Sequence, residues 1–210
     1  FQAELDKLGF HTYWVTYPDD VKRSGHLFAE MRGGKGKNIL LIGHLDTVFE
    51  PDHPFQKYTR KGDTAYGPGV SDMKAGDVSM IYIMKALHKI GVLQDMNLTL
   101  AFTGDEEKTG GPVSIVRKEL VEAGKWANIG LGFEGAVGMN TGTIARRSAS
   151  SWVLTTTGIQ GHSSQIFKDH LGYGAIFEAS RILNAFREEL APEEYLTFNP
   201  GTIVGGTDVN

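Results

Sequence analysis

The chain has 210 residues, of which 40% are hydrophobic and 22% are charged, and its formal net charge is −4. This composition is typical of a folded globular protein rather than a disordered one, and the charge gives no sign of a nucleic-acid partner. There is no cysteine, which excludes disulfides, thiolate metal sites and cysteine nucleophiles. No apolar run is long enough to span a bilayer, so we expect no membrane partner. The compartment stays open, because a cytoplasmic and a secreted or periplasmic location both fit.

Five runs of strand-forming residues lie in the first two thirds of the chain. The runs 13–17 and 26–31 are rich in aromatic and aliphatic residues, and the runs 38–42, 98–103 and 129–133 are almost continuously apolar. Continuous apolar runs of this length suit strands that are buried on both faces of a sheet.

Helical patterns lie between these runs. One helix is predicted from apolar residues at positions i, i+3, i+4, i+7 and i+10, with Gly91 as its stop. A second is expected to begin at Pro112, to carry Val113, Val116 and Leu120, and to end at Gly124. Alternating strands and helices predict an α/β fold with a parallel sheet. The apolar face of the first helix consists of Met80, Ile83, Met84, Leu87 and Ile90.

The pattern changes after Arg147. The run 152–157 reads as a strand, a helix is expected over 176–190, and the run 195–198 reads as another strand. We therefore expect a first domain at residues 1–147 and part of a second at 148–210, which with about sixty residues is marginal for an independent core.

Chemically capable side chains follow the predicted strands where those strands end. His44 and Asp46 come directly after the run 38–42, and their i, i+2 spacing puts them on one side of an extended chain. A neutral imidazole is a good zinc ligand, and an acid can orient it through its other ring nitrogen. The pair by itself is a weak signal, since surface histidines are several times more common than ligands.

Three further acidic clusters have two readings each. Asp72, ahead of the first long helix, suits a helix N-cap or a carboxylate that bridges two cations. The acids at 105–107 suit a solvated turn, or a metal ligand with a free general base beside it. Glu134, after the third apolar run, suits an exposed side chain or a ligand. His162 lies in a loop, where a histidine is usually exposed and has no role.

These clusters can nevertheless converge, because open α/β sheets bind ligands outside the carboxyl ends of their strands. Their order and spacing resemble the zinc exopeptidase family that includes glutamate carboxypeptidases of the carboxypeptidase G type, aminoacylases and succinyl-diaminopimelate desuccinylases. The resemblance covers essentially the whole chain. The matching segments are GHLDTV at 43–48, GPGVSDMK at 67–74, GDEEKTG at 104–110, FEG at 133–135 and GHSS at 161–164.

The resemblance implies a site with two zinc ions, or with other divalent metals such as cobalt or manganese. It implies that His44 and Glu134 ligate one metal, that Glu107 ligates the other, and that Asp72 bridges both. It also implies a cis peptide bond between Asp72 and Met73.

The same resemblance implies the catalytic roles. Glu106 would be the general base, Asp46 would orient His44, His162 would polarise the scissile carbonyl, and Asn210 would lie near the substrate. The expected fold is a three-layer α/β/α catalytic domain followed by part of an α+β lid that forms a homodimer. In that family a further histidine ligand follows the lid, so we expect it to lie beyond Asn210.

The reaction implied is hydrolysis of an amide bond beside a free carboxylate, in a small peptide or an N-acyl amino acid. Two alternatives stay open at this point. One is a metal-binding but non-hydrolytic relative, or a dimerisation module, against which the presence of Glu106 argues. The other is a two-metal aminopeptidase, which would prefer a free substrate amine.

Overall fold

The first of two compact units is built on a five-stranded sheet. The computed structural model describes residues 1–21, 23–206 and 208, and the chain divides into Phe1–Gly142 and Thr143–Asn210. The strand order in the sheet is β1-β2-β6-β3-β7. The five strands are β1 (His11–Val15), β2 (His26–Arg32), β3 (Lys35–His44), β6 (Met96–Thr103) and β7 (Ile129–Gly132).

The sheet is mixed rather than parallel throughout. β3 pairs in parallel with β6 and with β7, whereas β2 is antiparallel to both β6 and β1. The prediction of a parallel sheet is therefore right for β3, β6 and β7 and wrong for β1 and β2. The described residues between β1 and β2 form no helix, so the connection is not a crossover that could make these two strands parallel.

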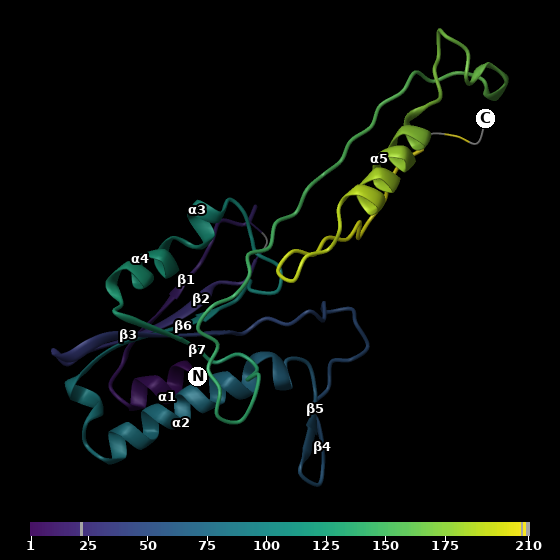
Figure 1. Ribbon diagram of the computed structural model, residues 1–210. Helices are drawn as coiled ribbons and strands as arrows, with labels where there is room; N and C mark the ends of the chain where they lie inside the picture. Colours follow the sequence, from purple (N-terminus) through teal and green to yellow (C-terminus); the bar gives the residue numbers. More distant parts are fainter. Residues whose placement is uncertain (22, 207, 209–210) are drawn as a thin grey trace. The chain divides into compact units, whose positions relative to one another are not determined.

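Helices cover both faces of this sheet, which gives the expected three-layer α/β/α arrangement (Figure 1). The short helix α1 and the long helix α2 lie on one face, and α3 and α4 lie on the other. A short irregular turn, η1, leads into α2, and a further turn, η2, precedes β6. The bounds are α1 (Gln2–Lys7), η1 (Val70–Lys74), α2 (Ala75–Lys89), η2 (Leu93–Asp95), α3 (Val113–Val116) and α4 (Lys118–Trp126).

The core follows from the alternation of side chains along the strands. On β6, Leu98, Leu100 and Phe102 join the core beneath α1 and α2, while Ala101 joins the smaller core beside α4. The neighbouring strands are buried in the same alternating way, since successive residues face opposite layers. β7 is the exception, because it lies at the edge of the sheet and its four residues are exposed.

The second predicted helix is interrupted. Arg117 separates α3 from α4, and its backbone leaves the helical region with φ −110° and ψ 5°. The carbonyl of Val116 accepts hydrogen bonds from the Tyr17 hydroxyl and from His26 Nε2. The helix also runs past Gly124 to Trp126, so the predicted end was two residues too early.

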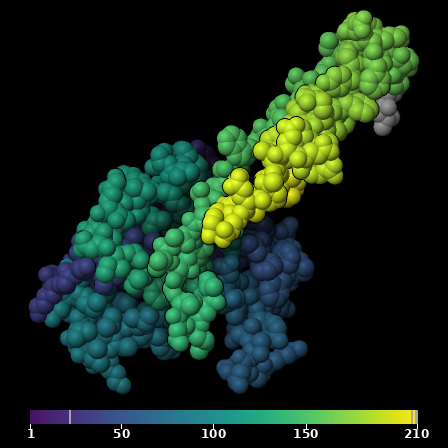
Figure 2. Space-filling model, in the orientation of Figure 1, coloured from purple at the N-terminus to yellow at the C-terminus, as the bar shows by residue number. Residues whose placement is uncertain are grey.

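A two-stranded hairpin lies outside the main sheet. Its strands, β4 (Thr59–Lys61) and β5 (Thr64–Tyr66), are antiparallel and were not predicted. In the space-filling view the blue hairpin projects from the first unit (Figure 2). Among the described residues, no helix combines the length and the apolar character that a membrane crossing needs.

The second unit contains the helix α5 (Ala175–Glu189), which was expected, and the short turn η3 (Ser163–Gln165). The strands expected at 152–157 and 195–198 do not form within the described part of this unit, apart from one isolated bridge between Glu193 and Leu196. A strand needs a hydrogen-bonded neighbour, and Trp152 and Val153, each 90% exposed, have none there. High strand propensity alone therefore did not make these two segments strands.

Candidate metal centre

Four of the predicted site residues follow the carboxyl ends of adjacent parallel strands. His44 is the last residue of β3, Glu106 and Glu107 follow β6, and Glu134 follows β7. Asp72 comes from η1, which is separate from the sheet. His44 is fully buried, whereas Asp72 and Glu134 are exposed. The sheet thus fixes the imidazole, and the carboxylates reach it from the solvent side.

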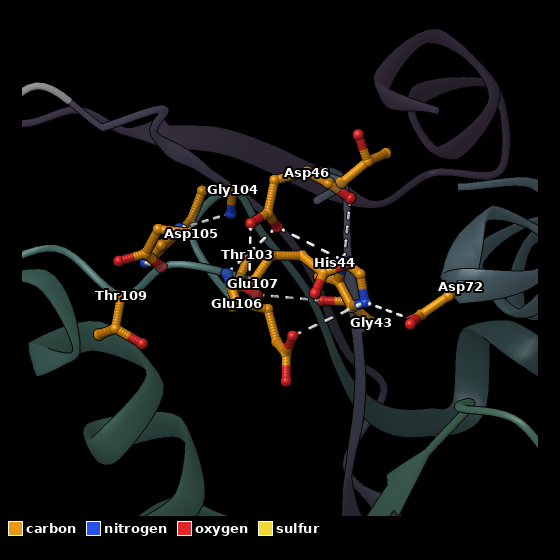
Figure 3. Close-up of polar contacts among 12 residues, drawn as sticks. Gly43, His44, Asp46, Asp72, Thr103, Gly104, Asp105, Glu106, Glu107 and Thr109 are labelled. Atoms are coloured by element: carbon orange, nitrogen blue, oxygen red, sulfur yellow. Dashed lines mark hydrogen bonds and ion pairs between the residues drawn. The ribbon is translucent and has the colours of Figure 1, made fainter. Parts of the chain in front are cut away.

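Three ligand-type side chains meet at one point. One ligand atom from each of His44, Asp72 and Glu134 lies within 4.8 Å of the others. His44 Nε2 is 3.0 Å from Asp72 Oδ1 and 3.6 Å from Glu134 Oε1. Glu106 Oε2 is 4.0 Å from the same nitrogen. Figure 3 shows Asp72 and Glu106 reaching His44 from different directions.

Asp46 connects the histidine to the turn after β6. Its carboxylate accepts the backbone N–H groups of Glu106 (3.1 Å) and Glu107 (2.9 Å). The same carboxylate is 3.4 Å from His44 Nδ1, and the Asp46 carbonyl oxygen is 3.1 Å from that nitrogen. One side chain therefore sets both the His44 ring and the backbone that carries two acidic residues.

The acidic side chains of the site perturb one another. Burial acts to lower the pKa of His44, but the Asp72 hydrogen bond and the charges of Glu134, Asp46 and Glu106 outweigh it, so the pKa is raised. Burial, with the negative charge of Asp72, raises the pKa of both Glu107 and Glu134 against the opposing effect of His44. Protonation of Glu107 and Glu134 is favoured first by burial and then by the like charge of Asp72 nearby.

The donor set fits a divalent cation. An imidazole nitrogen and carboxylate oxygens are the ligands that zinc takes in hydrolytic sites. A cation would offset the part of the rise in the pKa of Glu107 and Glu134 that comes from neighbouring negative charge. Glu107 is not in the three-residue group, although Asp46 holds its backbone beside that group.

Asp72 is not a helix N-cap. The N-cap of α2 is Lys74, and no side chain caps it. The Asp72 carboxylate bonds instead to His44, and the Asp72–Met73 peptide bond is cis. The reading of Asp72 as a capping residue is therefore wrong.

Two of the predicted site residues belong to the second unit. His162 is exposed and precedes η3, where its Nδ1 accepts the backbone N–H of Ser164 at 3.2 Å. This hydrogen bond leaves the ring proton on Nε2. Asn210 lies outside the described residues.

Two buried acids near the site carried no recognisable signal in the sequence. Asp105 is fully buried and pairs with Arg117, whose NH1 is 2.8 Å from Asp105 Oδ1, so the reading of 105–107 as a solvated turn is wrong for this residue. Asp77 on α2 is also fully buried, and neither of its carboxylate oxygens has a hydrogen-bond partner among the described residues. Nothing in the adjacent sequence indicates burial of either acid, because the partner of Asp105 is distant in sequence and Asp77 has no hydrogen-bond partner among the described residues.

A cavity of about 890 Å³ opens beside the turn after β6. Asp46, Glu107 and Lys74 border it, and the remaining wall is largely apolar, including Leu45, Phe49 and Tyr58. A small ligand could therefore approach the acidic residues from this side of the first unit.

Comparison with known proteins identifies relatives of the chain. The chain is 31% identical over 188 residues to carboxypeptidase G2 of a Pseudomonas species, covering 87% of this chain and 43% of that protein. It is 30% identical over 202 residues to the succinyl-diaminopimelate desuccinylase of Gluconobacter oxydans, covering 90% of this chain and 49% of that one. The chain thus spans less than half the length of these relatives.

One similar solved structure is an M20 family metallo-carboxypeptidase from Sulfolobus solfataricus, with 23% identity and a TM-score of 0.48, covering 64% of this chain and 30% of that one. Residues 40–210 match the profile of peptidase family M20/M25/M40. This match covers well over half of the chain and includes every ligand-type residue of the site. The chain therefore belongs to peptidase family M20/M25/M40.

Proposed function

We propose that the whole protein is a metal-dependent hydrolase that cleaves an amide bond beside a free carboxylate, in a small peptide or an N-acyl amino acid. The observation that carries this proposal is the meeting of His44, Asp72 and Glu134 with a further acid, Glu106, 4.0 Å from His44 Nε2. A structural metal site needs no additional carboxylate, whereas a hydrolytic one needs a general base. Similarity to a carboxypeptidase and a desuccinylase supports the choice of substrate class.

The proposed centre takes two divalent cations, which we expect to be zinc. His44 and Glu134 would hold one, Glu107 the other, and Asp72 would bridge them. When bound, such ions lower the pKa of a water and polarise a carbonyl group. The negative charges of Asp72 and Glu106, which add to the effect of burial in raising the pKa of Glu107 and Glu134, support this assignment because a cation would neutralise them.

Glu106 is the proposed general base. Its carboxylate is about half exposed, so it is open to both water and substrate. It would accept a proton from the attacking water and later donate that proton to the leaving nitrogen. Asp46 would keep Glu106 and Glu107 in register with His44 through its two backbone hydrogen bonds.

His162 and Asn210 are proposed to contact the substrate. The proton on His162 Nε2 could be donated to the carbonyl oxygen as negative charge develops on it. We also propose that residues 1–147 are the catalytic domain, that 148–210 belong to a lid, and that lids pair in a homodimer. In that arrangement His162 would serve the active site of the neighbouring subunit.

The test is hydrolysis by the zinc-loaded whole protein of N-acyl amino acids and dipeptides, each with its carboxylate free or amidated. We expect turnover of the free acids and at least about 10²-fold less for the amides, because the carboxylate is the recognised group. Glu106→Gln should retain zinc and lose at least about 10³-fold in kcat. Its matched control, Glu122→Gln on α4, should leave kcat unchanged.

Other outcomes would identify the alternatives. Preference for free-amine substrates over N-acylated ones would indicate an aminopeptidase. Tight zinc binding with no turnover of any substrate would indicate a non-hydrolytic relative. Full activity in Glu106→Gln would remove the general base from the mechanism.

A further inference from the structure

The turn after β6 has a second set of contacts on the side away from the metal centre. Gly104 is buried and Asp105 is fully buried, although the next residue, Glu106, is exposed. In Figure 3 Asp105 extends away from His44. The chain therefore places one acid in the interior immediately before the proposed base.

Arg117 binds both the side chain and the backbone of Asp105. Its NH1 is 2.8 Å from Asp105 Oδ1, and its NH2 donates to the Asp105 carbonyl oxygen at 3.0 Å. Asp105 Oδ2 accepts the backbone N–H of Gly110 at 2.8 Å. A buried carboxylate must be paired and hydrogen-bonded to be tolerated, and these contacts also fix the direction in which the chain enters Glu106.

His26 makes the second attachment. Its Nδ1 accepts the backbone N–H of Gly104 at 3.0 Å, and its Nε2 donates to the Val116 carbonyl oxygen at 2.9 Å. Together these bonds specify the neutral ring with its proton on Nε2. His26 therefore connects β2, the turn after β6 and the end of α3 within the core.

The turn passes too close to its neighbours to shift freely. A Cβ at position 104 would lie 2.4 Å from the carbonyl oxygen of Gly25 and 2.8 Å from Cβ of Ser24. Asp46 holds the same turn from the metal side through Glu106 and Glu107. The turn is thus bound on both sides, and only the Asp46 side belongs to the metal centre.

We propose that His26 and Arg117 are positioning residues for Glu106 and Glu107, acting through Gly104 and Asp105 from the interior. The inference rests on the proposed function for the role of Glu106 as base. A misplacement of about 1 Å can cost about 10²-fold in rate, so the loss of either attachment should lower kcat more than it changes KM.

Two substitutions of His26 separate its two hydrogen bonds. His26→Asn places an amide oxygen near the position of Nδ1 and so keeps the acceptor for Gly104. His26→Gln places an amide nitrogen near the position of Nε2 and keeps the donor to Val116. We expect His26→Gln to lower kcat by about 10- to 100-fold with KM changed by less than about threefold, and His26→Asn to lower kcat by less than about fivefold.

Two substitutions of Arg117, to lysine and to methionine, give an independent test of its contacts with Asp105. Arg117→Lys can still pair with the Asp105 carboxylate. Its single ammonium group lacks the separate N–H groups with which the guanidinium also reaches the Asp105 carbonyl oxygen. We expect its kcat to fall between those of the wild type and Arg117→Met. Leu8→Ala, in the core beneath α1, is the control for general destabilisation. It should lower the melting temperature comparably and leave kcat unchanged.

Two measurements test the inference without an assay of enzyme activity. Amide hydrogen exchange at Gly104, measured by NMR, should be at least about tenfold faster in His26→Gln than in His26→Asn, and zinc affinity should be weaker in His26→Gln. Equal exchange and equal zinc affinity in the two variants would overturn the inference. A loss of kcat that only follows the loss of melting temperature in all variants, including Leu8→Ala, would also overturn it. If the zinc-loaded wild type hydrolyses no substrate, the proposed function fails, and the exchange and zinc measurements still decide the positioning role.

Discussion

Asp77 is a carboxylic acid in a place that does not favour its charge. It is fully buried on α2, and its oxygens have no hydrogen-bond partner among the described residues. Burial raises its pKa from 3.8 to about 7, with His44 and Lys74 acting against the rise and Glu134 adding to it. A Cβ on Gly43 would lie 2.1 Å from Asp77 Oδ1, so the acid packs directly beneath the residue that precedes His44.

This shift predicts a pH dependence of stability in the metal-free chain. Because the folded-state pKa is above the unfolded value, the folded protein binds the additional proton between about pH 4 and pH 7. The free energy of unfolding should therefore fall as pH rises through that range, by at most about 4 kcal/mol at about 1.4 kcal/mol per pKa unit. Asp77→Asn keeps the shape without the charge and should remove this dependence.

The measurement is urea unfolding with a chelator present from pH 4 to pH 8.5, with Asp63→Asn on the exposed hairpin as control. The chelator is needed because a cation at His44 would lower the pKa of Asp77. At pH 8.5 Asp77→Asn should be more stable than the wild type, and Asp63→Asn should match the wild type. An unchanged pH slope in Asp77→Asn would show that Asp77 does not titrate in this range.

At the scale of elements, the five strands of the main sheet were predictable from their runs of aromatic and aliphatic residues, whereas the hairpin of β4 and β5 was not. The antiparallel pairing of β2 with β6, the break at Arg117 and the exposure of β7 were not predictable. Each depends on a contact with a distant segment, as Val116 with His26 and Tyr17 illustrates. The strands expected in the second unit failed for the same reason, since propensity does not supply a pairing partner.

The site residues were easier to predict than their supports. His44, Asp72, Glu106, Glu107 and Glu134 were singled out by the resemblance of the segments that carry them, because each residue alone is a weak signal. The roles of Asp105 and Asp77 depend on burial that adjacent sequence does not reveal. The acids at 105–107 resemble a solvated turn in the sequence, because nothing there shows that Arg117 pairs with Asp105.

The turns after β3 and β6 are joined by Asp46, which predicts that its substitution weakens metal binding. Asp46→Asn has one acceptor oxygen instead of two, so its amide group would face the N–H of Glu106 or Glu107. We expect zinc affinity to fall by about 10- to 100-fold, as measured by competition with a chelator. Glu50→Gln, an exposed acid on the same loop, should leave the affinity unchanged. Equal affinity in Asp46→Asn and the wild type would show that Asp46 does not position the ligands.

For the whole molecule, the proposed homodimer predicts complementation between inactive variants of the whole protein. Glu106→Gln and His162→Ala should each be nearly inactive alone. If His162 acts on a neighbouring subunit, mixing them under conditions that exchange subunits should restore part of the activity, since one site of the hybrid has both residues intact. No recovery after demonstrated exchange would exclude action between subunits. An active His162→Ala protein would remove His162 from the mechanism.

The most direct test of the metal centre is an anomalous difference map at the zinc absorption edge, from crystals of the whole protein grown with zinc. We expect a peak about 2.0–2.2 Å from His44 Nε2, in contact with carboxylate oxygens of Asp72 and Glu134, and a second peak on the other side of Asp72 toward Glu107. We also expect that Glu106 ligates neither ion. Zinc bound elsewhere, with no peak at His44, would contradict the assignment, and so would Glu106 as a direct ligand.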